Sequence, residues 1–213
     1  MLGITHFPLF IAAVFLLNLT PGPDTAYIVG RSLAQGRKAG VLSALGVSTG
    51  ACVHTLASAF GLTALLAASA TAFSVFKIAG AVYLIYLGTR LLLTKPRPGG
   101  VATAGAAAGM PRPLRAVYLQ GFWTNVLNPK VMLFFVSFFP QFVSAQSDYK
   151  PLAFLVLGGI FVAMSLVWSC FVAWIAGTAT QRLSGRARVR QWLERGVGSA
   201  FIGLGIKLAM TTR

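Results

Sequence analysis

The sequence is poor in acidic residues and in charge of any kind. Only 3 of its 213 residues are Asp or Glu, and 10% are charged, whereas 56% are hydrophobic. The mean hydropathy is +0.77. Soluble domains contain about 25% charged residues. The shortage of charge therefore leaves little room for a soluble domain and predicts a polytopic membrane protein.

Cysteine and histidine are also scarce, with two of each. Cys52 and Cys170 lie within apolar segments, so we expect small packing residues in the core rather than a disulfide framework. With so few Cys, His, Asp and Glu side chains, the sequence predicts neither a metal site nor another cofactor. No Lys or Arg precedes the first apolar run, so we expect no cleavable signal peptide.

Long apolar runs are what the sequence does contain. A helical span needs about 20 apolar residues. The segments are apolar on all sides and lack the alternation of a membrane β-barrel, which favours an all-α protein. Six transmembrane helices are predicted, at about 7–29, 40–67, 72–94, 116–143, 152–177 and 196–212.

Most of the 18 basic residues fall on alternate connections between these spans. Such a bias marks the cytoplasmic side, so both termini are predicted to lie outside. The basic side chains are expected to contact anionic lipid, and nucleic acid is not an expected partner. The three clusters are Arg31, Arg37 and Lys38; Arg90, Lys95, Arg97, Arg112 and Arg115; and Arg182, Arg186, Arg188, Arg190 and Arg195.

The first span contains an interruption. Asn18-Leu19-Thr20-Pro21-Gly22-Pro23-Asp24 has two prolines, and each removes a backbone donor and clashes with the preceding helical turn. Lipid offers the freed carbonyls no partner, so such a break is tolerated where protein or a watery cavity surrounds it. Asp24 is the only acid in any apolar span and predicts a substrate or ion pathway. The alternative is a helix end at the interface, with Asp24 in headgroup water.

The fourth span contains a second interruption, Asn125-Val126-Leu127-Asn128-Pro129-Lys130. Aligning Asn125 with Asn18 gives an offset of about half the chain, and both breaks combine an asparagine, a proline and a charged residue. A Pro/Gly/Ala-rich stretch at 96–115 separates the halves and is expected to be a cytoplasmic linker. We therefore predict a first repeat at 1–95 and a second at 116–213, within one membrane domain.

Three spans per half is an odd number, so the two repeats must be inverted relative to each other. Inverted repeats with broken helices 1 and 4 are typical of secondary transporters, whose sites lie where the breaks meet. Asp24 is suited to an ammonium group or a proton. Lys130 is suited to a carboxylate, or else pairs with Asp24, because buried charges are normally paired.

The second span is rich in glycine. Gly36 with Gly40, and Gly46 with Gly50, form small-xxx-small pairs that are expected to let helices approach closely. Gly46 to Gly50 also matches G-x-S-x-G, but the strand-turn-helix context of a serine hydrolase is absent. His54 lies on a different face from Ser48 and cannot act as its base. No enzyme is predicted. We expect His54 to be a hydrogen-bonded packing residue or a proton relay.

These motifs resemble the LysE/RhtB family of bacterial amino-acid exporters, in length, in span count and in the order of both breaks. The resemblance implies an exporter of an amino acid or derivative in the bacterial cytoplasmic membrane, driven by protons, and a homodimer. A transporter of divalent metals or of another small ion, within the wider superfamily, is the alternative. The predicted substrate-binding and proton-coupling residues are Asn18, Pro21, Gly22, Pro23, Asp24, His54, Asn125, Asn128, Pro129 and Lys130.

Overall fold

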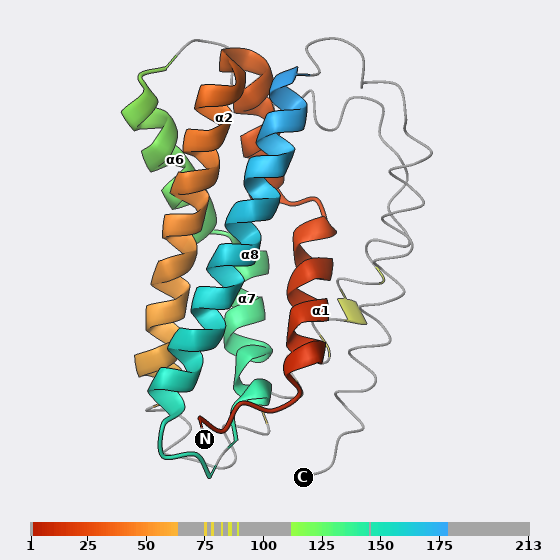
Figure 1. The fold of residues 1–213 in the computed structure, drawn as a ribbon, viewed down its shortest axis with the longest axis vertical. Helices are drawn as coiled ribbons and strands as arrows, with labels where there is room; N and C mark the ends of the chain where they lie inside the picture. Colours follow the sequence, from red (N-terminus) through yellow and green to blue (C-terminus); the bar gives the residue numbers. More distant parts are fainter. Residues whose placement is uncertain are drawn as a thin grey trace.

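The computed structural model describes residues 2–63, 112–144 and 146–178, together with isolated positions between 75 and 89. These ranges form a helical bundle, in which the β pairing consists of an isolated antiparallel bridge between Ile4 and Val143. The elements in chain order are α1 (Phe7–Leu19), α2 (Pro23–Ala57), the π-helical turn η1 (Ser58–Leu62), α6 (Leu114–Val126), α7 (Pro129–Ser137), the 3₁₀ turn η2 (Phe139–Phe142) and α8 (Lys150–Thr178) (Figure 1).

Helix α2 is a hairpin of two antiparallel arms, residues 23–35 and 37–57, which reverses at Gly36 (Figure 1). Gly36 has φ +79° and ψ −179°, a conformation that L side chains rarely adopt. A Cβ at Gly40 would collide with the side chain of Ser32, which shows how closely the arms approach. The reversal lies between the ranges predicted for the first two spans, 7–29 and 40–67.

The other predicted spans correspond to the structure to different degrees. The fifth, at 152–177, matches α8, and the fourth, at 116–143, is divided into α6, α7 and η2. The third and sixth, at 72–94 and 196–212, lie outside the described residues apart from a few isolated positions. Among the described helices, Pro23–Leu62 and Lys150–Thr178 are long and apolar enough to cross a membrane, although the first includes the reversal at Gly36.

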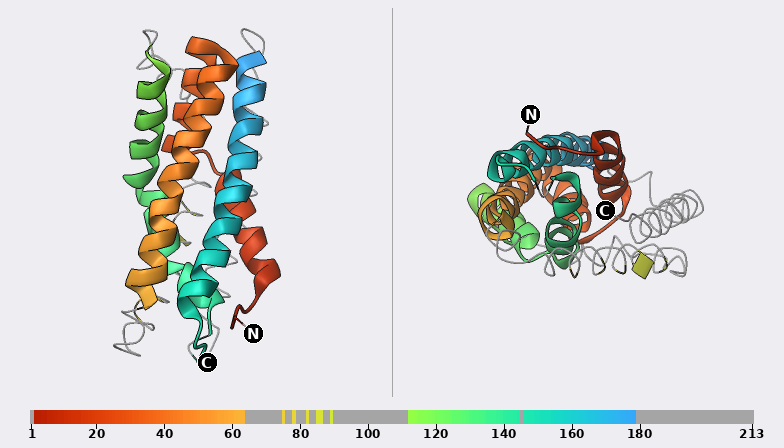
Figure 2. Two further views of the ribbon diagram at one scale, coloured as in Figure 1. Left: turned by 60° about the vertical axis from the view of Figure 1, so that its left-hand side comes forward. Right: turned by 90° about the horizontal axis from the view of Figure 1, so that it is seen from below.

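Helix α8 connects two sides of the bundle. Seen end-on in Figure 2, the second arm of α2 and helix α6 lie together on one side of the bundle, and α1 lies on the other side. Helix α8 packs against both α2 and α1. The main core is rich in phenylalanine because α7, η2 and the residue between them, Phe138, supply five such rings. Phe135 and Phe139 stack with centroids 4.2 Å apart, and Phe10 of α1 meets Phe142 edge-to-face at 5.2 Å. This cluster holds the half of the bundle containing α1, α7 and α8 together.

Close approach between α2 and α6 depends on glycine, as the second small-xxx-small pair predicted. A Cβ at Gly46 would collide with the carbonyl oxygen of Tyr118, and one at Gly50 would lie 2.7 Å from the Phe122 oxygen and 2.9 Å from Asn125 Cβ. In the first pair the prediction holds for Gly40 and is wrong for Gly36, which forms the reversal and where a Cβ would meet no described atom within 4 Å.

The described basic segments gather at one end of the bundle, as the charge pattern predicted. Gln35 Nε2 donates to the Arg112 carbonyl at 2.9 Å, and the Arg37 guanidinium lies over the Trp174 ring of α8 at 5.6 Å. One expectation was wrong. Arg31 does not contact lipid: it lies within α2, is 1% exposed, and donates to Gln35 and Gln120, both at 2.9 Å.

Arg31 belongs to a row of polar contacts between the first arm of α2 and the α6 region, which we call the polar seam. Its side chains are Tyr27, Arg31 and Gln35, spaced four residues apart on one helical face. Tyr27 Oη donates to the Val117 carbonyl at 2.6 Å, which completes the row. The seam joins these segments from the mid-bundle region to the basic end.

The cysteine prediction was partly wrong. Both residues are free thiols within helices, but Cys52 is exposed on α2 and Cys170 is half-buried on α8. An apolar segment does not reveal which of its faces is turned inward.

Candidate functional site

The first break lies between the end of α1 at Leu19 and the start of α2 at Pro23. Thr20 and Gly22 both adopt extended backbone conformations, so the chain leaves the helix before the prolines would interrupt it. Pro23 takes the first helical position, where its missing N–H is not needed. Asp24 follows in the first turn of α2, where a negative charge complements the helix dipole.

The second break is shorter and lies between Val126 and Pro129. Asn128 caps α7, since its Oδ1 accepts from the Lys130 backbone N–H at 3.0 Å. Pro129 again occupies the first helical position, and a charged residue again follows it. If the two helix starts are superimposed, Gly22-Pro23-Asp24 aligns with Asn128-Pro129-Lys130. This alignment differs by one residue from the one that pairs Asn18 with Asn125.

Lys130 joins the two breaks. Its Nζ donates to the carbonyls of Leu17 and Thr20, at 2.7 and 2.6 Å, so that it satisfies the end of α1. The last carbonyls of a helix lack intrahelical partners and attract cations. A Cβ at Gly22 would lie 3.4 Å from Lys130 Cδ, so glycine there accommodates the lysine stem. This capping role was not among those expected for Lys130.

Asp24 is held by α6. Asn125 Nδ2 donates to Asp24 Oδ2 at 2.8 Å across the two breaks. The carbonyl of Asn125 in turn lies 3.2 Å from His54 Nε2, and because a carbonyl only accepts, Nε2 carries the hydrogen. The His54 ring stacks on Phe135 with centroids 5.6 Å apart. His54 thus supports the backbone of the residue that holds Asp24.

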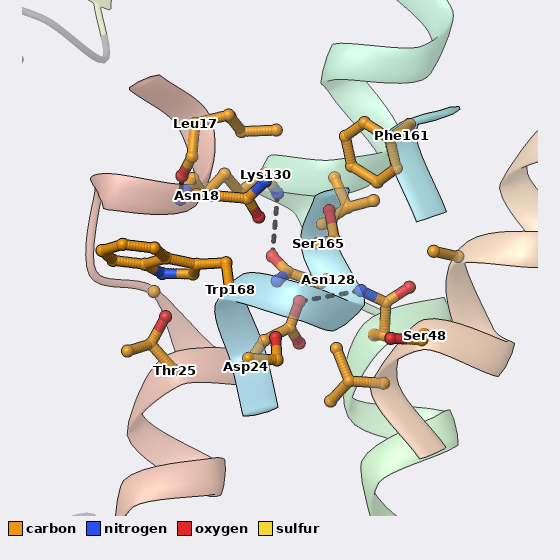
Figure 3. Close-up of a pocket in the computed structure, with 16 residues that line it drawn as sticks. Leu17, Asn18, Asp24, Thr25, Ser48, Asn128, Lys130, Phe161, Ser165 and Trp168 are labelled. Atoms are coloured by element: carbon orange, nitrogen blue, oxygen red, sulfur yellow. Dashed lines mark hydrogen bonds between the residues drawn. The ribbon is translucent and has the colours of Figure 1, made fainter. Parts of the chain in front are cut away.

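A cavity of about 40 Å³ lies where the two breaks face α8 and the second arm of α2 (Figure 3). By a comparable measure one water needs about 10–15 Å³, so the space corresponds to about three waters. Its lining residues are Leu17, Asn18, Gly22, Asp24, Thr25, Val47, Ser48, Ala51, Asn125, Asn128, Lys130, Val131, Phe161, Ser165, Trp168 and Ser169.

Five polar atoms of the lining residues are buried and have no hydrogen-bond partner within the described part of the chain. Buried polar atoms are normally paired, because leaving one unpaired costs about 1–3 kcal/mol. A group of them around one cavity indicates a place where a polar ligand or water completes the hydrogen bonding. The atoms are Asp24 Oδ1, Ser48 Oγ, Asn125 Oδ1, Ser165 Oγ and Trp168 Nε1.

The structure brings most of the predicted site residues together. Six line the cavity: Asn18, Gly22, Asp24, Asn125, Asn128 and Lys130. The other four, Pro21, Pro23, His54 and Pro129, do not line it. The prolines shape the breaks, and His54 contacts the cavity residue Asn125.

Helix α8 contributes a wall of the cavity that was not predicted. Phe161, Ser165, Trp168 and Ser169 line the cavity and lie on one face of that helix. Serine at i and i+4 in an otherwise apolar segment was a usable signal, because those positions share a helical face. Ser48 was examined only as a nucleophile, and it lines the cavity from α2.

Comparison with known proteins identifies the family. The pattern of the LysE type translocators matches residues 15–212. The chain belongs to the LysE type translocator family. It is therefore a transporter rather than an enzyme, which confirms both the resemblance and the exclusion of catalysis.

Relatives of this translocator match it over nearly their whole length. An uncharacterized membrane protein of Pseudomonas aeruginosa is 34% identical, covering 99% of this chain and 98% of its own. A leucine efflux protein of Enterobacter sp. strain 638 is 27% identical, covering 97% and 96%. The leucine efflux protein of Salmonella typhimurium is 25% identical with the same coverage. No solved structure matches the chain.

Proposed function

We propose that this LysE type translocator exports an amino acid or amino-acid derivative across the bacterial cytoplasmic membrane in exchange for protons. Family membership and the leucine efflux relatives support the transport of an amino acid. The proposed coupling to protons rests on the position of Asp24. Its Oδ2 accepts from Asn125, and its buried Oδ1 lines the cavity without a partner among the described residues.

One carboxylate in a small cavity can hold a proton or the ammonium group of a substrate, but not both. An ammonium beside a protonated Asp24 would lose its counter-charge, and an unpaired charge away from water is strongly unfavourable. Substrate binding and proton binding are therefore mutually exclusive. This exclusion is the requirement for antiport.

The two breaks provide the hinge in this proposal. The end of α1 is attached to α7 through Lys130, whereas the start of α2 is attached to α6 through Asn125. We propose that inverted repeats at 1–95 and 116–213, joined by a cytoplasmic linker at 96–115, rock around these contacts. Both termini then face outward.

The apolar part of the cavity wall favours an apolar substrate side chain. Leu17, Val47, Val131 and Phe161 line it, and several relatives are named leucine efflux proteins. We therefore propose leucine as the first substrate to test. Membrane lipid and a second copy of the chain are further proposed partners, the second copy through the family resemblance.

No observation favours the alternative of a divalent-metal transporter. Within the described residues, no group of three or more His, Cys, Asp or Glu side chains lies together. The one carboxylate at the cavity is accompanied by amides and hydroxyls instead.

Transport in proteoliposomes tests the proposal. Purified protein is reconstituted with an imposed pH gradient, and uptake of radiolabelled leucine and the other common amino acids is measured. We expect accumulation driven by the gradient for the wild type and none for Asp24→Asn, because an amide cannot exchange a proton. Asp148→Asn is the matched control, since Asp148 is an exposed acid away from the cavity. Full gradient-driven transport by Asp24→Asn would falsify the coupling role.

A further inference from the structure

The cavity has two chemically different sides. Asp24 and Asn125, from α2 and α6, present oxygen atoms, whereas Trp168 of α8 presents an indole N–H. Figure 3 shows Trp168 and Ser48 at opposite edges of the site, with Asp24 and Ser165 between them. Residues of both kinds line the same small cavity.

The hydrogen-bonding capacity of these atoms restricts what can satisfy them. A carboxylate oxygen and an amide oxygen only accept, so Asp24 Oδ1 and Asn125 Oδ1 need a donor. The indole N–H only donates, so Trp168 Nε1 needs an acceptor. The hydroxyls of Ser48 and Ser165 can do either. A complementary ligand therefore carries donors at one end and acceptors at the other.

Lys130 is already engaged elsewhere. Two of its three ammonium protons go to the carbonyls of Leu17 and Thr20. Withdrawing it to bind a substrate carboxylate would leave the end of α1 unsatisfied. The carboxylate-binding groups should therefore be sought among side chains whose hydrogen bonding is incomplete.

We infer that α8 provides the carboxylate subsite, through Ser165 Oγ and Trp168 Nε1, while Asp24 and Asn125 hold the ammonium group of the same substrate. Ser165 is 7% exposed, and its hydroxyl oxygen and the Trp168 nitrogen both have no partner within the described residues. The inference rests on the proposed function and names the substrate class, a free α-amino acid with both charged groups exposed to recognition.

The dimensions of the cavity agree with this assignment. A space of about three waters accommodates an ammonium group and a carboxylate one carbon apart. The side chain of leucine would then extend against apolar lining residues such as Leu17 and Val131 and move them outward, so those positions should influence size selectivity.

A ligand series separates the two ends of the substrate. L-leucine, L-leucinamide and N-acetyl-L-leucine are titrated into purified protein in nanodiscs by isothermal calorimetry. If transport selects another amino acid, its amide and its acetyl derivative replace those of leucine. Leucinamide lacks the carboxylate and N-acetyl-leucine lacks the ammonium group, so each reports on one side of the cavity.

For the wild type we expect the free amino acid to bind about tenfold or more tightly than either derivative, because each derivative loses a hydrogen bond to a charged group. In Ser165→Ala and Trp168→Phe the amino acid should lose most of its advantage over leucinamide. Its advantage over N-acetyl-leucine should persist in both. A general loss of folding would lower all three affinities together.

Two control variants lie outside the cavity. Ser43→Ala removes a buried hydroxyl that already donates to the Ala39 carbonyl at 2.9 Å, and Trp123→Phe alters an exposed tryptophan. Both should keep the wild-type preference. If Ser165→Ala and Trp168→Phe also keep the preference over leucinamide, the subsite is wrong while the proposed function stands. If no amino acid binds the wild type, both the subsite and the proposed function are wrong.

Discussion

Polar side chains line the contact between α2 and α6 at both of its ends, but the two ends are used differently. In the polar seam, Tyr27, Arg31 and Gln35 each donate to α6 or to the segment just before it. At the cavity, the side chain of Asn125 donates a hydrogen bond to Asp24, and each of the two residues has one side-chain oxygen without a partner among the described residues. The seam therefore has the character of a helix contact, and the cavity that of a binding site.

The difference has an energetic consequence. A satisfied buried polar group stabilises the packing of the helices around it, whereas an unsatisfied one weakens the protein until a ligand or water binds. Replacing seam residues should therefore lower stability and leave recognition unchanged. Replacing cavity residues whose polar atoms have no described partner should lower binding and leave stability nearly unchanged. Four substitutions test this distinction.

The largest loss of stability is expected for Arg31→Leu. The substitution removes two hydrogen bonds from a buried guanidinium and leaves the oxygens of Gln35 and Gln120 without their donor. Hydrogen bonds to charged groups contribute about 1.5–3 kcal/mol each, so the loss of two should lower the free energy of unfolding by roughly 3–6 kcal/mol. Unfolding by SDS in mixed micelles measures it. An unchanged unfolding curve would show that the seam does not stabilise the bundle.

A slightly smaller loss is expected for Lys130→Met, which keeps the apolar stem but removes the cap of α1. The Leu17 and Thr20 carbonyls would lose a charged donor, at roughly 1.5–3 kcal/mol for each bond. Water in the adjacent cavity can replace part of the hydrogen bonding that these carbonyls lose. Leucine affinity per folded molecule should change less than in Trp168→Phe. A greater loss of affinity than of stability would instead identify Lys130 as a substrate ligand.

Gly46→Ala tests the close contact between the second arm of α2 and the backbone of α6. The new Cβ would collide with the Tyr118 carbonyl, and overpacking of this kind costs about 1–3 kcal/mol. Gly159→Ala on α8 is the matched control, because its Cβ would meet no described atom within 4 Å and alanine favours helix. The midpoint temperature of thermal unfolding should be lower than wild type in Gly46→Ala and unchanged or higher in Gly159→Ala. Equal midpoints would contradict the close approach of α2 and α6.

The smallest effect on stability is expected for Ser48→Ala. Its hydroxyl has no described partner, so the free energy of unfolding should change by less than about 1 kcal/mol, while leucine binding weakens. Ser43→Ala on the same arm should show the reverse, because that hydroxyl is already bonded to Ala39. Paired unfolding and calorimetric titrations distinguish them. If both variants lose stability and neither loses affinity, Ser48 belongs with the seam.

The sequence revealed the charged residues of the site more readily than its neutral ones. Asp24 and Lys130 were found because a charge beside a proline is conspicuous in an apolar segment. Ser165 and Trp168 were missed because serine and tryptophan are ordinary in such segments, and nothing local says whether their polar atoms find partners. Arg31 was misplaced because its position beyond the predicted first span suggested a loop, whereas α2 continues to the reversal at Gly36.

Local chemistry alone specifies where the helices must be interrupted, since a proline cannot donate to the preceding turn and lipid supplies no substitute partner. It also specifies which few charges lie in the apolar segments. The meeting of the two interruptions, the capping of α1 by Lys130 and the arrival of α8 beside Asp24 depend on how the helices pack. Those contacts join residues far apart in the chain, so no short stretch of sequence contains them.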